Sequence, residues 1–313
     1  MAQSPAHKFG QIIGDVVEAA VEPLLREFAD RHDLYLDRKG PRPARTGRKV
    51  SWVDSCANTH DLDYVLEQGG SAEHIGTPVA FIETAWRRYT KHSRNKAQEI
   101  QGAILPLAEA HRSSAPFIGV ILAGVFTDGA LSQLRSLGFS VLYFPYQTVV
   151  EAFRTVDLDA HFTEDTADAE FARKVRRWER LPGKRRAEAA ERLLQVNSGE
   201  VRRFILALQQ SVTRKIELVR ILPLHGAAIE RTSVKEAISF VEKYREDRSG
   251  ASKPLTRYEV EIRYRNGDRI QGQFADRQQT IAFLRGYLPP SLQPAPRSAS
   301  SRGGIRRSDG GAR

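Results

Sequence analysis

The spacing of apolar residues in the first half of the chain predicts a regular series of helices and strands. Residues 9–31 carry Ile13, Val17, Val21 and Phe28 at helical spacing, which is typical of an amphipathic helix. The pattern continues with strands at 34–37, 61–67 and 79–86, a helix at 93–111, strands at 117–125 and 140–145 separated by a helix at 131–138, and a helix from 147 onward. The last two strands are apolar throughout, and two such strands joined through a helix need a sheet covered on both faces. We therefore expect residues 1–160 to form one α/β domain.

The remainder of the chain has a different pattern. Residues 161–248 are highly charged and are predicted to be a basic helical region. Residues 255–290 are predicted to be a small ββα unit, because residues 258–274 alternate around Asn266-Gly267, a strong hairpin signal, and an amphipathic helix follows at 276–288. Residues 291–313 are poor in apolar side chains and are expected to be a disordered basic tail. No internal repeat is visible in the sequence.

Composition narrows the class of protein. A chain of 313 residues with 41% hydrophobic content is long enough to bury a sizeable core. Its single cysteine, Cys56, excludes an internal disulfide. The polar N-terminus does not resemble a signal peptide, and no apolar run reaches the ~18 residues that span a bilayer. We expect a cytoplasmic protein with no membrane partner.

The positive charge is concentrated in two segments. The net charge is +10, and residues 171–220 contain fourteen Lys or Arg against five Glu, while residues 291–313 contain five Arg and one Asp. A localised basic surplus favours a polyanion such as nucleic acid. A solvated helix face that binds nothing is the alternative.

Acidic residues lie at the ends of two predicted strands. Asp61 and Asp63 open the strand at 61–67, which alternates and is expected to be half-buried, and Glu83 closes the apolar run VAFIETAW. If these strands are antiparallel neighbours, Asp63 lies opposite Glu83. Two converging carboxylates repel each other unless a cation sits between them, and this set of ligands suits Mg²⁺. The alternative is that both acids are solvated strand ends.

In the order of its elements and the acids of DYVLE and VAFIETA, the chain resembles the PD-(D/E)xK nuclease superfamily, the fold of many type II restriction endonucleases. The resemblance covers roughly residues 8–150. It implies a restriction-endonuclease-like core, a mixed central sheet flanked by helices, and Mg²⁺-dependent hydrolysis of DNA phosphodiester bonds. Asp63 and Glu83 then bind the metal, with Asp61 as the less favoured first acid and Glu18 or Glu22 of the first helix as possible additions.

The sequence departs from the family pattern at one position. The family has a lysine two residues after the second acid, where this chain has Ala85. Some members supply the charge from the following helix, and here Lys96 is the preferred candidate, with Glu99 as a further ligand or as a partner that holds Lys96. The alternative is that Lys96 and Glu99 form a structural ion pair.

The resemblance also implies partners. Double-stranded DNA is the expected substrate and a homodimer the expected assembly, with a DNA methyltransferase encoded nearby if the chain belongs to a restriction system. A catalytically inactive DNA-binding module with the nuclease fold, or a DNA repair or mobile-element nuclease, remains an alternative. Basic residues expected to contact DNA lie in the loop 38–49, beside the acidic strand and in the charged helices, and they are Arg42, Arg45, Arg48, Lys49, Arg87, Arg88, Lys91, Arg176, Arg177, Lys184 and Arg185.

Overall fold

The computed structural model describes residues 4–224, 227–245 and 257–288, apart from the side chains of residues 90–92. Within it the chain divides into two compact units. The first comprises Met1–Lys215 with Tyr264–Ile270, and the second comprises Ile216–Arg263 with Gln271–Arg313. The predicted tail 291–313 lies outside the described residues. Among the residues that are described, no helix combines the length and apolarity needed to cross a membrane.

A mixed five-stranded sheet organises the first unit. Its order is β1-β4-β5-β6-β7, with β1 Leu34–Arg38, β4 Tyr64–Gln68, β5 Thr77–Arg87, β6 Phe117–Gly124 and β7 Ser140–Pro145. The pairs β1/β4 and β4/β5 are antiparallel, whereas β5/β6 and β6/β7 are parallel. The parallel half returns each time through a helix, as the buried strands predicted. The expected mixed sheet flanked by helices is therefore confirmed.

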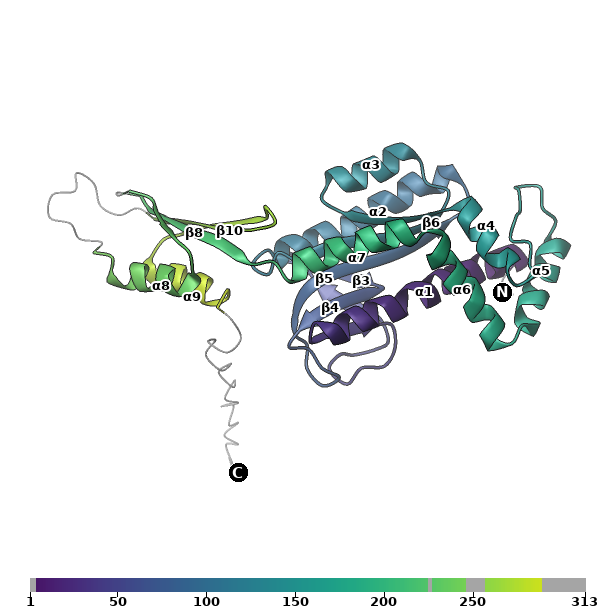
Figure 1. Ribbon diagram of the computed structural model, residues 1–313, viewed down its shortest axis with the longest axis horizontal. Coiled ribbons are helices and arrows are strands. Elements are labelled where there is room, and N and C mark those ends of the chain that lie inside the picture. Colours follow the sequence, from purple (N-terminus) through teal and green to yellow (C-terminus); the bar gives the residue numbers. More distant parts are fainter. Residues whose placement is uncertain (1–3, 225–226, 246–256, 289–313) are drawn as a thin grey trace, which may run out of the picture. The chain divides into compact units, whose positions relative to one another are not determined.

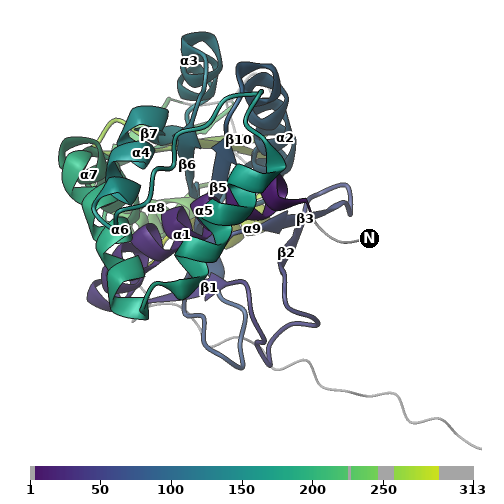
Figure 2. The ribbon, with the colours of Figure 1, turned by 90° about the vertical axis from the view of Figure 1, so that its right-hand side faces the viewer.

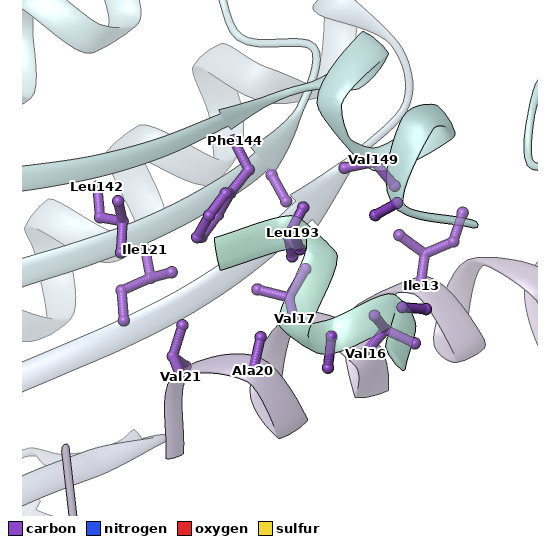
Figure 3. Close-up of a cluster of buried hydrophobic side chains, with 14 of the residues drawn as sticks. Ile13, Val16, Val17, Ala20, Val21, Ile121, Leu142, Phe144, Val149 and Leu193 are labelled. Atoms are coloured by element: carbon purple, nitrogen blue, oxygen red, sulfur yellow. The ribbon is translucent and has the colours of Figure 1, made fainter. Parts of the chain in front are cut away.

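Helices cover both faces of this sheet (Figure 1). One face packs against α1 Pro5–Arg31, α4 Tyr146–Arg154, α6 Gly183–Val196 and α7 Ser198–Val212, and α5 Asp168–Arg180 packs beside α1. Figure 2 shows α1, α5 and α6 side by side. The other face packs against α2 Thr90–Ala110 and α3 Asp128–Ser136. In Figure 3, Val17 and Ala20 of α1, Leu193 of α6 and Phe144 of β7 meet in one apolar cluster, because each presents its buried side to the sheet.

The segment DLDYVLE departs from the prediction. It forms two strands instead of one, since β3 Thr59–Leu62 pairs with β2 Val50–Val53 in a separate hairpin and β4 begins at Tyr64. Asp63 lies at the break between them. The half-buried alternation was also wrong, because β4 is an inner strand covered on both faces and all of Tyr64–Glu67 is buried. Glu67 can be buried because Arg42 pairs with it.

The strand containing Glu83 also continues further than its apolar run suggested. β5 extends to Arg87, because β6 pairs with it in parallel as far as Gly124. Glu83 therefore lies inside a strand and faces Val120 of β6 in the register.

The second unit corrects the prediction that residues 161–248 are wholly helical. After α7 the chain forms β8 Ile216–Pro223, β9 Ile229–Arg231 and α8 Val234–Lys243. The predicted hairpin and helix follow as β10 Tyr258–Tyr264, β11 Arg269–Phe274 and α9 Arg277–Arg285, and the four strands form one sheet of order β11-β10-β8-β9. The ββα pattern thus occurs twice, a repeat that the sequence did not reveal because the residues of the two copies differ.

Candidate active site

The predicted acids and lysine meet in one cleft of the first unit. The cleft has a volume of about 560 Å³ and lies between α1, the start of β4, the middle of β5 and α2. Its lining comprises His7, Gly10, Gln11, Gly14, Asp15, Val17, Glu18, Asp63, Glu83, Thr84, Ala85, Trp86, Arg87 and Lys96. Asp63, Glu83 and Lys96 therefore line the same cleft. In total its lining includes four acidic and two basic side chains.

Asp63 directly precedes β4 and is held there by contacts from the neighbouring strand, β5. β4 and β5 are antiparallel with Tyr64 opposite Ile82, so the preceding residue of β4 and the following residue of β5 come together, as expected from the sequence. One carboxylate oxygen of Asp63, Oδ2, accepts hydrogen bonds from Thr84 N at 2.7 Å and Thr84 Oγ1 at 2.6 Å. These bonds fix the orientation of the carboxylate toward β5.

Glu83 is largely buried in the cleft. Its side chain is 14% exposed, and its Oε1 lies 3.3 Å from Lys96 Nζ. Its Oε2 is buried and has no hydrogen-bond partner among the described residues. Burial raises the pKa of Glu83 to about 7, with a further upward contribution from the negative charge of Asp63 and opposing contributions from Lys96 and from the backbone N–H of Asp63. A buried carboxylate oxygen without a donor is costly in metal-free protein and is a natural ligand for a cation.

Lys96 reaches the cleft from α2. Its side chain is 18% exposed, and Nζ lies 3.6 Å from Glu99 Oε2 in addition to its contact with Glu83. Glu99 itself is 62% exposed and lies on the solvent side of the pair. Ala85 is buried, packs with the α2 side of the sheet and brings no charge to the cleft, whereas Lys96 extends into the cleft from α2.

Helix α1 contributes the opposite wall. Glu18 lines the cleft, and its pKa is raised by partial burial and then by the charges of Asp63 and Asp15. The pKa of Asp15 is also raised by partial burial, while Lys39 acts to lower it. Glu22 is directed elsewhere, because its Oε1 pairs with Arg26 at 2.7 Å and Arg38 at 3.3 Å.

Sequence reasoning missed several residues of this wall. His7, Gln11 and Asp15 line the cleft with Glu18 at spacings of three or four along α1. That spacing marks one helix face, so the polar stripe could have been found in the sequence once Glu18 was considered.

Asp61 lies outside the cleft. It sits on β3, where Lys49 Nζ donates to Oδ2 at 2.6 Å and Ser51 Oγ donates to Oδ1 at 2.6 Å. These contacts explain its lowered pKa, with the Lys49 hydrogen bond as the largest cause. Asp63 is thus the acid that the structure brings to Glu83.

Two arginines of the loop 38–49 are structural groups. Arg42 is buried and pairs with Asp37 at 2.9 Å and Glu67 at 2.6 Å. Arg45 donates from Nε to Asp37 Oδ2 at 3.1 Å. Their expected contact with DNA is corrected, because a guanidinium occupied by buried carboxylates cannot reach a phosphate. Arg48 and Lys49 are exposed, and Lys49 pairs with Asp61.

The other basic candidates are distributed over several surfaces. Arg87 lines the cleft, whereas Arg88 donates to Phe162 O and stacks over Tyr146 at 4.0 Å, a packing role that corrects its assignment to DNA. The side chain of Lys91 lies outside the described residues. Those on α5 and α6 are Arg176 and Lys184, which are exposed, Arg177, which donates to Asp157 O at 2.7 Å, and Arg185, which donates to Thr155 O at 3.0 Å and pairs with Glu188.

The cleft fits a hard divalent cation through few protein ligands. In the described part of the chain, no group of three or more His, Cys, Asp or Glu side chains is gathered closely enough to hold a metal by itself. Mg²⁺ commonly takes one or two carboxylates and keeps several waters. Asp63 and the unpartnered Oε2 of Glu83 supply that donor set.

Comparison with known proteins gives no family. No family model matches the chain, and no curated protein matches it. A solved crystal structure of a protein of unknown function, AF1548, aligns with 61% of this chain and 99% of its own, at 10% identity and a TM-score of 0.26. A likeness at this TM-score supports no conclusion on fold or function.

Proposed function

We propose that the protein is a Mg²⁺-dependent DNA endonuclease that hydrolyses phosphodiester bonds, with a restriction-endonuclease-like core of the PD-(D/E)xK type. The observation that carries the proposal is the environment of Glu83. One of its oxygens contacts Lys96 at 3.3 Å, the other is buried without a donor among the described residues, and Asp63 lines the same cleft. A nuclease of this type binds its metal ion between two carboxylates and has a lysine beside them, which is the arrangement of Asp63, Glu83 and Lys96.

The residues of the cleft would divide the chemistry among them. Asp63 and Glu83 would hold Mg²⁺, which when bound supplies Lewis-acid polarisation of a phosphate oxygen and activation of water. Lys96 Nζ has three donors and would orient the attacking water and balance negative charge that develops on the phosphate. Glu99 would hold Lys96 from the solvent side, since its Oε2 lies 3.6 Å from Nζ.

The preferred biological setting is a type II restriction enzyme acting on double-stranded DNA. Cleavage of both strands at a symmetric site needs two active sites, so a homodimer is proposed as the active form. A DNA methyltransferase encoded nearby would protect the host DNA in that setting.

Cleavage of supercoiled plasmid tests the proposal. Wild-type protein is expected to nick or linearise plasmid with Mg²⁺ or Mn²⁺ and to be inactive in EDTA, and Asp63→Asn and Glu83→Gln are expected to lose cleavage while remaining folded. The matched control is Asp61→Asn, which replaces an acid of the same segment outside the cleft. If wild type leaves plasmid, linear DNA and branched junctions intact with either metal, the enzyme proposal is wrong.

An inactive DNA-binding module is the second candidate, and one observation favours it. Two hydrogen bonds from Thr84 already satisfy Oδ2 of Asp63. If this orientation prevents metal binding, the protein would retain DNA without cutting it. Calorimetric titration with Mg²⁺ or Mn²⁺ separates the two candidates, because only the enzyme needs a cation that is lost in Asp63→Asn.

A further inference from the structure

The loop that joins β1 to β2 is fixed by its own buried arginines. Arg42 donates to Ser71 O at 3.0 Å from Nε and to His74 O at 2.7 Å from Nη2, in addition to its pairs with Asp37 and Glu67. Arg45 donates to Arg38 O at 2.8 Å. The loop is closed at its base, because Gly40 N donates to Arg48 O at 2.8 Å. Buried ion pairs and backbone hydrogen bonds thus order the backbone of this loop, from which the exposed side chains extend.

Those outer side chains surround a second cavity. It has a volume of about 540 Å³, and its charged lining residues are Arg26, Asp30, Asp37, Arg38, Lys39, Arg42 and Arg48. Asp37 and Arg42 neutralise each other, so four cations remain against Asp30. Within the described residues, Lys39 and Arg48 make no ion pair and are exposed.

Arg26 and Arg38 each make an ion pair that leaves most of their N–H donors available. Arg26 and Arg38 share one carboxylate oxygen of Glu22, at 2.7 Å and 3.3 Å. A guanidinium has five N–H donors, so a single shared oxygen leaves most of them available to another anion. A phosphate is an anion that such a fork binds in bidentate fashion.

The cavity continues the active-site cleft along helix α1. Residues at spacings of three or four form one polar face, which runs from Glu18 in the cleft through Glu22 to Arg26 in the cavity. Glu18 and Arg26 are separated by roughly 12 Å of helix axis at about 1.5 Å per residue. Lys39 lines the cavity, and its positive charge also acts against the raised pKa of Asp15 and Glu18 in the cleft.

We propose that this cavity is a phosphate-binding subsite for the polynucleotide strand that passes through the cleft, with Arg26, Arg38, Lys39 and Arg48 as its cations. Where the duplex axis runs along α1, roughly 12 Å equals the axial rise of three or four nucleotides of one strand, at about 3.4 Å each. The subsite rests on the proposed function for its substrate, and it assigns strand binding to the pre-ordered loop beside the acids.

The test is the salt dependence of DNA binding in metal-free buffer, where cleavage does not intervene. Fluorescence anisotropy with a labelled DNA duplex is measured for wild type, for Lys39→Ala/Arg48→Ala and for Arg31→Ala. Arg31 is the matched control, since it is an exposed cation of α1 that pairs with Glu27 and does not line the cavity. Inorganic phosphate and a single-stranded oligonucleotide are added as competitors in separate titrations.

We expect the double variant to lose about tenfold in affinity at low salt and to reduce the slope of log K against log salt by roughly 2, about 0.9 for each phosphate contact. Arg31→Ala should leave the slope unchanged. An unchanged slope in the double variant, or an equal loss in Arg31→Ala, overturns the subsite. Displacement of the duplex by millimolar inorganic phosphate would also overturn it, because the cavity would then be a small-anion site.

Failure of the nuclease proposal has a different signature. Absence of metal-dependent cleavage with the slope change intact rejects the enzyme and keeps the subsite as part of a DNA-binding surface. Intact cleavage with no slope change rejects the subsite and keeps the enzyme.

Discussion

Lys96 Nζ lies 3.3 Å from Oε1 of Glu83, although the two residues are thirteen apart in sequence and belong to α2 and β5. The ammonium partly offsets the burial that raises the pKa of Glu83, so the two side chains form one electrostatic unit. In the proposed nuclease, Lys96 of α2 would take the place of the lysine that the PD-(D/E)xK pattern has at position 85.

Replacement of Lys96 is the sharpest test of that unit. We expect Lys96→Ala to lower the single-turnover rate of DNA cleavage by about 10²–10³, the usual loss when one donor to developing charge is removed. DNA affinity should change little, because the side chain is 18% exposed and directed at Glu83. The control is Arg94→Ala, an exposed cation on the same helix. A purely structural ion pair would show the opposite result, with reduced stability and an unchanged rate.

The choice of Asp63 over Asp61 gives a second prediction. Asp61→Asn removes the partner of an exposed lysine, a surface pair worth about 0–1 kcal/mol, so activity and stability should remain near wild type. Asp63→Asn removes a cleft carboxylate and should abolish cleavage and weaken binding of Mn²⁺. Both variants are compared by plasmid nicking and calorimetric metal titration. Equal loss in the two variants would contradict the assignment.

The sequence predicted the first unit in large part because its signals are local. The apolar run of β6, the Gly138 end of α3 and the spacing in α1 each follow from nearby residues. The proximity of Asp63, Glu83 and Lys96 could be predicted because strand ends and helix turns have fixed geometry. Arg42 was misread because its partners Asp37 and Glu67 become neighbours only when β1 pairs with β4. β8 was missed because it follows three charged helices and its residues Ile216 and Val219 continue the helical spacing of apolar residues in α7.

The pKa of Glu83 makes stability depend on pH in metal-free protein. A carboxyl that titrates at about 7 when folded and at 4.5 when unfolded keeps its proton longer in the folded state. The stability that the protonated Glu83 carboxyl contributes is therefore fully present below pH 4.5. It is lost as the pH rises through 7, which lowers the free energy of unfolding by an amount on the order of 3 kcal/mol. Glu83→Gln should remove this loss and unfold at higher urea than wild type at pH 8, but not at pH 5.

Bound metal should make wild type more stable than Glu83→Gln at pH 8, the reverse of their order without metal. Millimolar Mg²⁺ or Ca²⁺ at pH 8 should stabilise wild type by mass action and leave Glu83→Gln unchanged. Urea unfolding at pH 5 and pH 8, with and without metal, measures both effects. If Glu83→Gln is no more stable than wild type at pH 8 without metal, then burial of the Glu83 carboxylate does not destabilise the protein.

Arg42 should be required for folding of the loop instead of for direct DNA contact. Arg42→Ala leaves Glu67 buried without its cation and leaves Asp37 with Arg45 alone, and an unpaired buried charge typically costs about 3–5 kcal/mol. Arg42→Lys should recover only part of this loss, because an ammonium cannot form the forked contacts of a guanidinium. Urea unfolding measures both, with Arg48→Ala as an exposed control expected within about 0.5 kcal/mol of wild type.

Gly14 gives a prediction in which stability and activity move in opposite directions. Glycine inside a helix is less favourable than alanine by roughly 0.8–1.0 kcal/mol. No atom of the protein lies within 4 Å of the position that a Cβ would take at Gly14, so the protein itself does not require glycine there. That position faces the cleft between Gln11 and Glu18. We expect Gly14→Ala to raise Tm and to lower the rate of DNA cleavage, and a bulkier Gly14→Leu to lower the rate further.

Gly102 of α2 is the matched control, since it also has open space and lies outside the cleft. Gly102→Ala should raise Tm at full activity, and an equally active Gly14→Leu would show that substrate does not pass along this face of α1.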